Sequence, residues 1–537
     1  MKLIPWRNPE FLRHFRAELR WHRAVAVAVV VVVVCFLLWL ICWSEQQAIL
    51  AAARRGAQQF GGVFNEQLAK MERESVSLTL RTFYQWLLAF QIFVVTLWSL
   101  LACTQAVSGE RERKTWDFQR ATRLSSAELL VGKLAGEPIL AYFAVACSLP
   151  LAVIAGVAGG FAIQRIAAAY VFLLADAFFL GLVGLCLSTL VETRSRGAGT
   201  IAALGLYVLA LFSYTLNRGP LPGLSALSPL TGIRAVADDA YLFGMDLYPA
   251  ILLGRTVPWL LLSLALQFSL ALWLLLMLLR NLKRDYEQIQ PLSRMQAVAC
   301  AVFLNAVLYA LVRPRSYLGV GSLPGSSFRS SEELASFMVG IDGLLLFLIG
   351  IAILTPPERL RVWWRTRETT GGATLSEDGL PWPWLLLCGA AVYAVMTAGL
   401  LLWRPNFPLE TDTVLTAGLR LLVVLVFVMR DISFIQWCHL TRLRRPLVKG
   451  FLYLCLYYVS ALVIMHVGSY VSPTFPARAA TLLTPFGVFD SSDKSVATSI
   501  YAGLGFQLAG IMLQLVAVTV FIGAIHHRLG RPSTVPP

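Results

Sequence analysis

The chain has 537 residues, of which 57% are hydrophobic and only 14% are charged, and its formal net charge is +15. A soluble globule of this length needs more polar surface than this composition supplies, which excludes the ordinary soluble classes. The composition therefore predicts a membrane protein that crosses the bilayer many times.

Twelve apolar runs are long enough to cross a hydrocarbon core. A transmembrane helix needs about 20 mostly apolar residues to span roughly 30 Å. We therefore predict an all-α polytopic fold with about 12 transmembrane helices in two six-helix blocks, residues 24–290 and 291–537, preceded by residues 1–23. The predicted spans are residues 24–43, 84–106, 138–157, 167–190, 198–216, 256–279, 295–312, 334–355, 382–403, 414–429, 450–471 and 500–525.

The distribution of Lys and Arg predicts the orientation of these spans. With the N-terminus inside, the inner segments carry more basic residues than the outer ones, although the outer segments are longer in total. The positive-inside rule then places both termini in the cytoplasm. Because this asymmetry accounts for the positive net charge, we expect no nucleic acid as a partner.

The first 23 residues predict an interfacial helix rather than a cleaved signal. Phe11, Phe15 and Leu19 recur at four-residue steps with arginines between them, as in an amphipathic helix that lies on a membrane surface. A plain basic flank that anchors the first span is the alternative interpretation. The first outer segment, residues 44–82, lacks proline and carries apolar residues at helical spacing, so it predicts a helical hairpin.

Residues 108–133 form a charged stretch between the second and third predicted spans. The stretch is too polar to stay in lipid, and its first half predicts a short helix on the membrane surface. Ser125 and Glu128 fit a capping box, which predicts that a second helix starts there and runs into the membrane. The residues expected to cover one side of the surface helix are Trp116, Phe118, Ala121 and Leu124.

The second block repeats some features of the first. Its inner loop, residues 356–381, also has 26 residues and a mixed basic and aromatic start. This correspondence suggests an internal duplication, with a second contact for a partner on the loop. A competing match between residues 441–443 and residues 122–124 would make the second block rearranged. The candidate contact residues of the second loop are Arg361, Trp363, Trp364 and Arg365.

Motifs of catalysis are absent from the sequence. It contains no G-x-x-x-x-G-K-T nucleotide loop, no G-x-S-x-G and no H-E-x-x-H. Its nine cysteines include no C-x-x-C pair, and its six histidines show no metal-ligand spacing. We therefore predict no catalytic residue, no metal and no cofactor, and we expect any ATP hydrolysis to occur on another chain.

A few polar side chains fall inside the predicted spans. An unpaired charge there costs at least a few kcal/mol, so these side chains should face the protein interior or a wet cavity. We expect Arg420 to pair with Asp176, with Asp342 as the alternative partner. Such residues serve either as structural pins between helices or as a gate of a transport path. The candidates are Gln91, Asp176, Asp342 and Arg420.

Three stretches carry a resemblance to a known family. They are NPEFLRHFRAELR near the start, GERERKTWDFQRATRLSSAELLVGK after the second span, and LSPLTGIRAV before the sixth. Together they resemble ABC type-2 exporter permeases, the membrane subunits of ATP-binding cassette exporters, most strongly over residues 1–290. In that family the leading helix lies on the inner surface, and the loop after the second span is a coupling helix seated in the ATPase subunit.

The resemblance implies a permease subunit in the plasma membrane of a bacterium, embedded in the lipid bilayer and driven by a separate ATP-binding cassette ATPase subunit in two copies. Because the chain has more than the usual six spans, either one chain supplies both halves of the pore or two chains pair as a homodimer. The residues implied to contact the ATPase are Glu110, Arg111, Glu112, Thr115 and Trp116.

Two other functions compete with this interpretation. A membrane-embedded glycosyltransferase that uses lipid-linked sugars would need an acidic pair on the first outer loop, for which the candidates are Glu72 and Glu74. An ion-coupled secondary transporter is disfavoured by the scarcity of carboxylates inside the spans.

Overall fold

The protein divides into two compact units. The first comprises Met1–Ile289 with Leu311–Arg313, and the second comprises Gln290–Ala310 and Pro314–Pro537. The structure, a computed structural model, describes residues 4–60, 63–190, 196–218, 221–231, 250–284, 289–312, 331–370, 376–403, 413–441, 446–470, 482–485 and 500–529.

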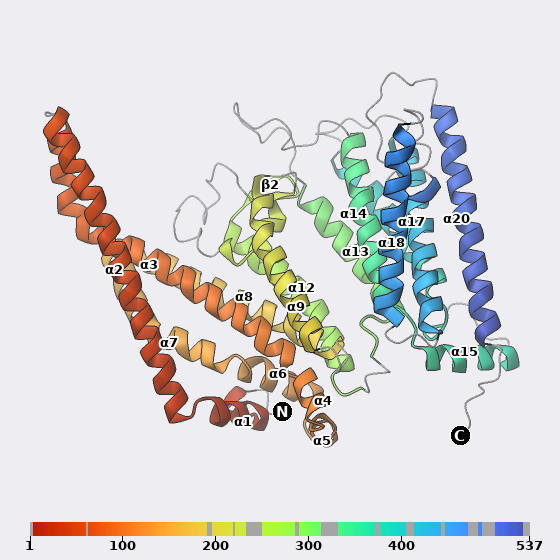
Figure 1. The fold of residues 1–537 in the computed structure, drawn as a ribbon, viewed down its shortest axis with the longest axis horizontal. Helices are drawn as coiled ribbons and strands as arrows, with labels where there is room; N and C mark the ends of the chain where they lie inside the picture. Colours follow the sequence, from red (N-terminus) through yellow and green to blue (C-terminus); the bar gives the residue numbers. More distant parts are fainter. Residues whose placement is uncertain are drawn as a thin grey trace. The chain divides into compact units, whose positions relative to one another are not determined.

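The first unit is built from helices, apart from one short antiparallel hairpin of two strands (Figure 1). Its elements are η1 (Pro5–Arg7), α1 (Pro9–Glu18), α2 (Trp21–Phe60), α3 (Val63–Gln105), α4 (Ser108–Glu112), α5 (Trp116–Ala121), α6 (Ser126–Gly136), α7 (Ile139–Ala158), α8 (Ile163–Leu190), α9 (Arg196–Phe212), η3 (Ser213–Arg218), η4 (Pro222–Leu227), β1 (Ala250–Leu252), β2 (Arg255–Val257) and α12 (Trp259–Asn281).

Helix α3 is the centre of the first unit and contacts α2, α7, α8 and α9. Its apolar side chains Leu87, Leu88 and Val95 are fully buried. Polar side chains also join the helices, since the hydroxyls of Thr96 on α3 and Tyr207 on α9 lie 2.9 Å apart. The cost of burying these hydroxyls is offset because each retains a hydrogen-bond partner.

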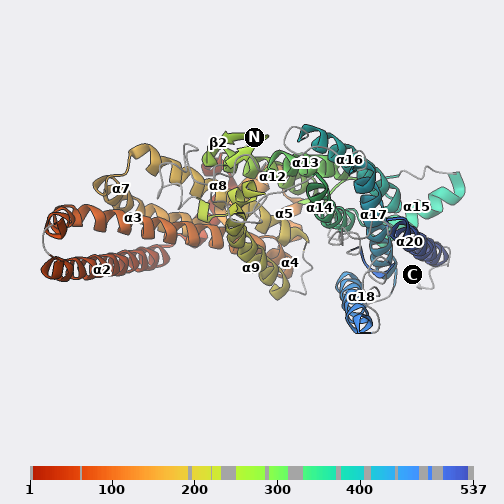
Figure 2. The ribbon, with the colours of Figure 1, turned by 90° about the horizontal axis from the view of Figure 1, so that it is seen from above.

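The described part of residues 44–82, the predicted first outer segment, is helical and continues α2 and α3 directly. Figure 2 shows the two helices running side by side. Arg54 on α2 and Glu72 on α3 form an exposed ion pair at 2.9 Å. Helix α2 has 40 residues and a length of about 60 Å, roughly twice the hydrocarbon thickness, so the hairpin extends well beyond a bilayer.

The second unit is a helical bundle around α17. Helix α17 contacts α14, α16, α18 and α20, and its middle is buried on every side, which is typical of a core helix. The surface helix α15 runs across the ends of α17 and α20 through an apolar cluster that includes Leu360, Trp363 and Ile525 (Figure 1). The helices are α13 (Arg294–Ala310), α14 (Ser331–Ala352), α15 (Pro357–Thr370), α16 (Trp382–Leu402), α17 (Thr413–His439), α18 (Pro446–Ser469) and α20 (Ile500–Leu529).

Ten helices of the described residues are long and apolar enough to cross a membrane, so the protein is a multi-pass, all-α membrane protein. The predicted fifth and seventh spans correspond to α9 and α13, which have 17 residues each. Seventeen residues rise about 25 Å, short of a typical hydrocarbon core. The count of twelve and the orientation of the termini therefore stay predictions.

Parts of some predicted features lie outside the described residues. These are residues 61–62 of the segment 44–82, residues 232–236 of LSPLTGIRAV, residues 371–375 of the loop 356–381, residues 442–443 of the competing repeat match and residue 471 of the eleventh predicted span.

Candidate functional site

The leading helix α1 is fixed at its start by Asn8. The Asn8 side chain accepts hydrogen bonds from the amides of Glu10 (2.9 Å) and Phe11 (3.4 Å), and Pro9 takes the first helical position. These are typical N-terminal features, because the first amides of a helix have no partner inside it. Asn8 Nδ2 also donates to the carbonyl oxygen of Glu128 at 2.6 Å, so the cap ties α1 to the start of α6.

Helix α6 begins in the capping box that the sequence predicts. The amide of Glu128 donates to Ser125 Oγ at 3.2 Å, and the amide of Ser125 donates to the Glu128 carboxylate at 2.9 Å. The two side chains therefore satisfy each other's backbone, which confirms a helix start at this position.

Two glycines on α6 bring this helix close to α1. A Cβ atom at Gly132 would lie 2.6 Å from Glu10 Cβ, and one at Gly136 would lie 2.9 Å from His14 Cβ. Real Cβ atoms need more room than this, so only glycine fits without a shift of α1. The spacing of four residues places both glycines on one face and makes that face the contact surface.

Lys133 lies buried at the centre of a charge cluster between α1, α4 and α6. Its Nζ lies 2.6 Å from the Glu110 carboxylate and 3.3 Å from that of Glu10, and it donates to the Ala106 carbonyl oxygen at 3.2 Å. Arg13 lies 2.7 Å from Glu10 and 2.5 Å from Glu110. Each carboxylate thus contacts both cations, and the desolvated charges offset one another.

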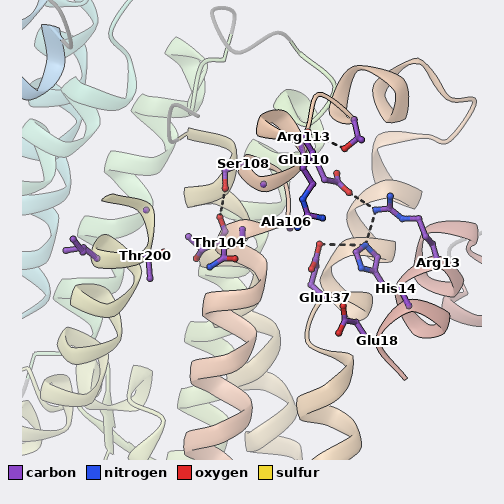
Figure 3. A pocket seen from close by; sticks show the side chains of 16 residues that line it. Arg13, His14, Glu18, Thr104, Ala106, Ser108, Glu110, Arg113, Glu137 and Thr200 are labelled. Carbon is purple, nitrogen blue, oxygen red and sulfur yellow. Dashed lines mark hydrogen bonds and ion pairs between the residues drawn. The ribbon is translucent and has the colours of Figure 1, made fainter. Parts of the chain in front are cut away.

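His14 and Glu137 extend this cluster towards α7. Figure 3 shows Arg13, His14, Glu110 and Glu137 pointing toward one another from α1, α4 and the end of α6. His14 Nε2 lies 3.3 Å from Glu10 and 3.7 Å from Glu137. We call Glu10, Arg13, His14, Glu110, Lys133 and Glu137 the charge cluster.

The cluster changes the acidity of its carboxyl groups. Burial alone would raise the pKa of Glu10, but the hydrogen bond with His14 and the charges of Lys133 and Arg13 outweigh it and lower the pKa to about 2. Burial raises the pKa of Glu137, and the nearby charges of His14 and Lys133 offset only part of that effect. Glu10 is therefore ionised at every physiological pH.

The stretch before α6 folds as two short helices, α4 and α5, instead of one. Lys114, which lies between them, has a φ of 59°, a left-handed conformation that a continuous right-handed helix excludes. Trp116 is buried, with Lys133 Nζ 5.4 Å from the centre of its ring, whereas Phe118 is 77% exposed. The prediction that Trp116 and Phe118 share a covered side is wrong, because residues two apart on a helix point about 200° apart.

Hydrogen bonds anchor α4 to the end of α8. The amides of Val107 and Ser108 both donate to Ser188 Oγ at 2.9 Å, and Arg111 donates to the Thr189 carbonyl oxygen at 3.0 Å. Among the residues implied to contact an ATPase, Glu110, Arg111 and Trp116 therefore make contacts inside the first unit. Thr115 is exposed and Glu112 is half-buried.

A cavity of about 1010 Å³ opens beside the charge cluster (Figure 3). Residues of α1, α3, α4 and α9 line it, and most of the lining residues are polar or charged. The charged lining residues are Arg13, His14, Glu18, Glu110, Arg113 and Glu137.

Three cluster side chains, Glu10, His14 and Glu110, have ligand atoms within 4.8 Å of one another, close enough for a metal ion. Their carboxylates already bind Lys133 and Arg13, and a metal ion would have to displace these two cations. The arrangement therefore fits an ion-pair network better than a metal centre.

The polar residues of the first-unit spans join helices. Gln91 Nε2 donates to Ser148 Oγ on α7 at 2.8 Å, and the Tyr170 hydroxyl on α8 donates to Gln91 Oε1 at 2.9 Å. Asp176 on α8 is buried and accepts a hydrogen bond from Gln267 Nε2 on α12. Both side chains thus form hydrogen bonds with neighbouring helices.

Arg420 and Asp342, the polar candidates in the second-unit spans, differ in whether they have hydrogen-bond partners. Arg420 on α17 donates to the Glu332 carboxylate at 3.0 Å and to the Ser336 hydroxyl, both on α14. The structure thus gives Arg420 a partner other than Asp176 or Asp342. Asp342 on α14 is fully buried, and neither of its carboxylate oxygens has a hydrogen-bond partner among the described residues.

The candidate contact residues of the second unit lie on α15. Trp363 is buried and Trp364 stacks near His526 of α20, with 4.4 Å between the ring centres. Arg361 and Arg365 are exposed, on the side of the helix opposite Trp363. The tryptophans therefore hold α15 in place, and the arginines are the side chains that a partner can reach.

The sequence alone did not reveal two groups of charges. It did not pair Lys133 with Glu10, because the two residues lie more than 100 positions apart and no local pattern connects them. It also ended the tenth span at Met429, whereas α17 continues to His439 and buries Arg430 against Asp431 at 2.6 Å. Two adjacent opposite charges followed by another apolar run were the available signal.

Comparison with known families gives a match over part of the first unit. A family model described as ABC-2 type transporter matches residues 10–233, a range that includes α1 and the whole of residues 108–133. No curated protein and no solved structure matches the chain.

Proposed function

Because residues 10–233 match a family model described as ABC-2 type transporter, we propose that the chain is the permease subunit of an ATP-driven exporter. A separate ATPase subunit that docks on residues 108–133 would drive it. The proposed location is the plasma membrane of a bacterium, with α1 and the charge cluster on the cytoplasmic side.

The burial of Lys133 between Glu10 and Glu110 is the observation that carries this proposal. These ion pairs, with the glycine contact of α6, join α1, α4 and α6 into one body. A push on α4 or α5 therefore reaches α1 and, through α6, the third span without being absorbed by a flexible loop. A partner that changes shape on ATP binding needs such a rigid receiver.

We place the docking surface on the exposed side of this body. Glu112, Thr115 and Phe118 provide the contacts, and the exposed Phe118 ring is the apolar anchor. Glu110, Arg111 and Trp116 position the surface from within. An exposed aromatic ring on a charged segment is the kind of side chain that a protein partner buries.

The test is co-purification with a candidate ATPase, followed by measurement of permease-stimulated ATP hydrolysis. Phe118→Ser should reduce stimulation at least tenfold, because loss of a buried aromatic anchor costs about 2 kcal/mol or more. Ile49→Ser is the matched control, since Ile49 is an exposed apolar residue of the α2 hairpin. Equal stimulation by the Phe118 variant and the control would reject this docking surface.

The second unit supplies a further candidate contact. We propose that Arg361 and Arg365 on α15 meet a second copy of the ATPase, which would give one chain and two ATPases per complex. A photocrosslinker at Val362, which is exposed between them, should then capture the ATPase. Capture of lipid alone, with two chains per complex, would favour a homodimer.

A further inference from the structure

The helices of the second unit pack on one another in the same order as the spans of the first. In the first unit α3 packs on α7 and α8, α8 packs on α12, and α2 packs on α7. In the second unit α14 packs on α16 and α17, α17 packs on α20, and α13 packs on α16. Many transporters are built from such internal repeats. The spans α2, α3, α7, α8, α9 and α12 thus correspond, in chain order, to α13, α14, α16, α17, α18 and α20.

In each unit a tryptophan from the loop after the second span packs against the ends of the fourth and sixth spans. Trp116 does so in the first unit and Trp363 in the second. This loop therefore contacts the same two helices in both units. The apolar partners are Cys186 of α8 and Leu278 of α12 in the first unit, and Leu440 at the end of α17 and Ile525 of α20 in the second.

These apolar contacts set the register between the two units. Asp176 on α8 and Arg430 on α17 each lie ten residues before the apolar partner of the fourth span. Gln267 on α12 and Gln514 on α20 each lie eleven residues before the apolar partner of the sixth span. Asp176 therefore corresponds to Arg430, and Gln267 corresponds to Gln514.

The corresponding side chains are bonded to each other within each unit. Gln267 Nε2 donates to the Asp176 carboxylate, and Arg430 Nη1 donates to Gln514 Oε1 at 2.8 Å. The ionisable group is an acid in the first unit and a base in the second, and an amide suits both because it has a donor end and an acceptor end. All four side chains are buried, so these bonds offset part of their desolvation.

Both glutamines also lead to the backbone that precedes the last span. In the second unit Gln514 Nε2 donates to the Leu482 carbonyl oxygen at 2.8 Å. In the first unit Gln267 Nε2 lies 3.3 Å from Ser263 Oγ, and the Ser263 hydroxyl donates to the Ala226 carbonyl oxygen. The sixth span of each unit therefore holds one backbone carbonyl of the segment before it.

These two carbonyls have the same place in a shared motif. Residues 226–229 have the sequence Ala-Leu-Ser-Pro and residues 482–485 have the sequence Leu-Leu-Thr-Pro, and the bonded carbonyl belongs to the first residue of each. The hydroxyl residue of the motif, Ser228 or Thr484, is buried in both units. Apolar packing of helices does not require a bond to the same backbone atom, so the match indicates a common plan.

We propose that the second unit is a second permease domain built on the plan of the first, in which Gln514 and Arg430 hold residues 482–485 against the fourth and sixth spans. This rests on the proposed function of the first unit. The matching family model ends at residue 233, so the proposal gives the second unit a role in transport that this match does not assign. Because one buried glutamine links the fourth span, the sixth span and the backbone before the sixth, a movement of either helix displaces that backbone.

The test is ATP hydrolysis by the co-purified ATPase with variants of both glutamines. Gln267→Leu and Gln514→Leu should each lower the stimulation of hydrolysis several-fold, because each leaves buried polar groups without their partner. Ser269→Ala and Thr519→Val are the matched controls, since both hydroxyls donate to a carbonyl oxygen of their own helix, and they should stimulate like wild type. A loss confined to Gln267→Leu would overturn the proposal, whereas a wild-type chain that gives no stimulation would reject the proposed function.

A third variant separates this role from a purely structural one. Gln514→Glu keeps an acceptor for Arg430 but removes the donor to the Leu482 carbonyl oxygen. Its melting temperature should stay close to that of wild type, because the bond between α17 and α20 remains, yet its stimulation of ATP hydrolysis should fall as in Gln514→Leu. Stimulation equal to wild type in this variant would also overturn the proposal.

A measurement without the ATPase tests the shared plan by itself. Ser228→Cys and Thr484→Cys, each in a chain whose native cysteines are replaced, should be protected from a water-soluble maleimide because both positions are buried. Each thiol should become reactive when the glutamine of its own unit, Gln267 or Gln514, is changed to Leu. A thiol at position 484 that stays protected, while the one at position 228 becomes reactive, would show that the two units do not share this plan.

Discussion

At the scale of single residues, Lys133 holds the first unit together where α1, α4 and α6 meet. Replacing it with Met keeps the length of the side chain but leaves Glu10 and Glu110 buried with one cation fewer. Breaking a buried ion pair from one side costs about 3–5 kcal/mol. We expect Lys133→Met to lower the unfolding free energy by that amount, measured by denaturant unfolding in detergent micelles.

The control for this change is Arg54→Ala. Arg54 forms an ion pair with Glu72 on the hairpin, but both side chains are exposed. Exposed pairs contribute roughly 0–1 kcal/mol, so this variant should be close to wild type. Similar losses of unfolding free energy in the two variants would show that the buried ion pairs of Lys133 stabilise the protein no more than an exposed pair does.

The lowered pKa of Glu10 predicts how the stability of the protein depends on pH. Its pKa in the folded protein is lowered from 4.5 to about 2, so its contribution to stability is fully present above pH 4.5 and is lost as the pH falls towards 2. The shift corresponds to about 3 kcal/mol. Glu10→Gln should therefore be less stable than wild type at pH 7, and the difference should shrink between pH 4.5 and pH 3. A difference that stays constant over this range would contradict the assignment.

At the scale of elements, the contact between α1 and α6 depends on the absence of two side chains. Gly132→Ala places a methyl group 2.6 Å from Glu10 Cβ, so α1 must move away. We expect a loss of about 1–3 kcal/mol from overpacking, together with weaker ATPase stimulation. The measurements are thermal unfolding and ATP hydrolysis with the bound ATPase.

Gly56→Ala is the control for this glycine. Gly56 lies within α2, and a Cβ there has nothing within 4 Å. Alanine is a better helix former than glycine by about 1 kcal/mol, so this variant should be as stable as wild type or more so. Destabilisation by both variants would point to a general effect of alanine in these helices.

The helices show where sequence reasoning succeeds and where it stops. Local signals were sufficient for the start of α6, because Ser125 and Glu128 lie three residues apart and satisfy each other. They failed for the stretch before it, where a left-handed residue at Lys114 breaks the helix and no glycine announces the turn. Trp116 is buried in an apolar cluster with Leu129 and Leu130, and Lys133, which is 17 positions away, lies over its ring. Helical spacing alone cannot predict these contacts.

At the scale of the whole molecule, hydropathy predicted where the helices lie but not what their polar residues bind. All twelve predicted spans overlap helices. Backbone N–H and C=O groups inside a bilayer have no water to bind, and a helix satisfies them within its own segment. The partners of Gln91 and Asp176 come from other helices of the first unit, and they depend on packing that apolar runs do not encode.

Asp176 and Arg420 provide the last prediction, because each has its partner within its own unit. Asp176 accepts from Gln267, and Arg420 binds Glu332. Side chains with no shared partner affect stability additively within about 0.5 kcal/mol. Asp176→Asn combined with Arg420→Met should therefore lower the unfolding free energy by the sum of the two single effects, as measured by a double-mutant cycle in micelles. A coupling energy above about 1 kcal/mol would instead indicate a direct pair between Asp176 and Arg420. In that case the protein with both Asp176→Arg and Arg420→Asp would recover the stability that each single swap loses.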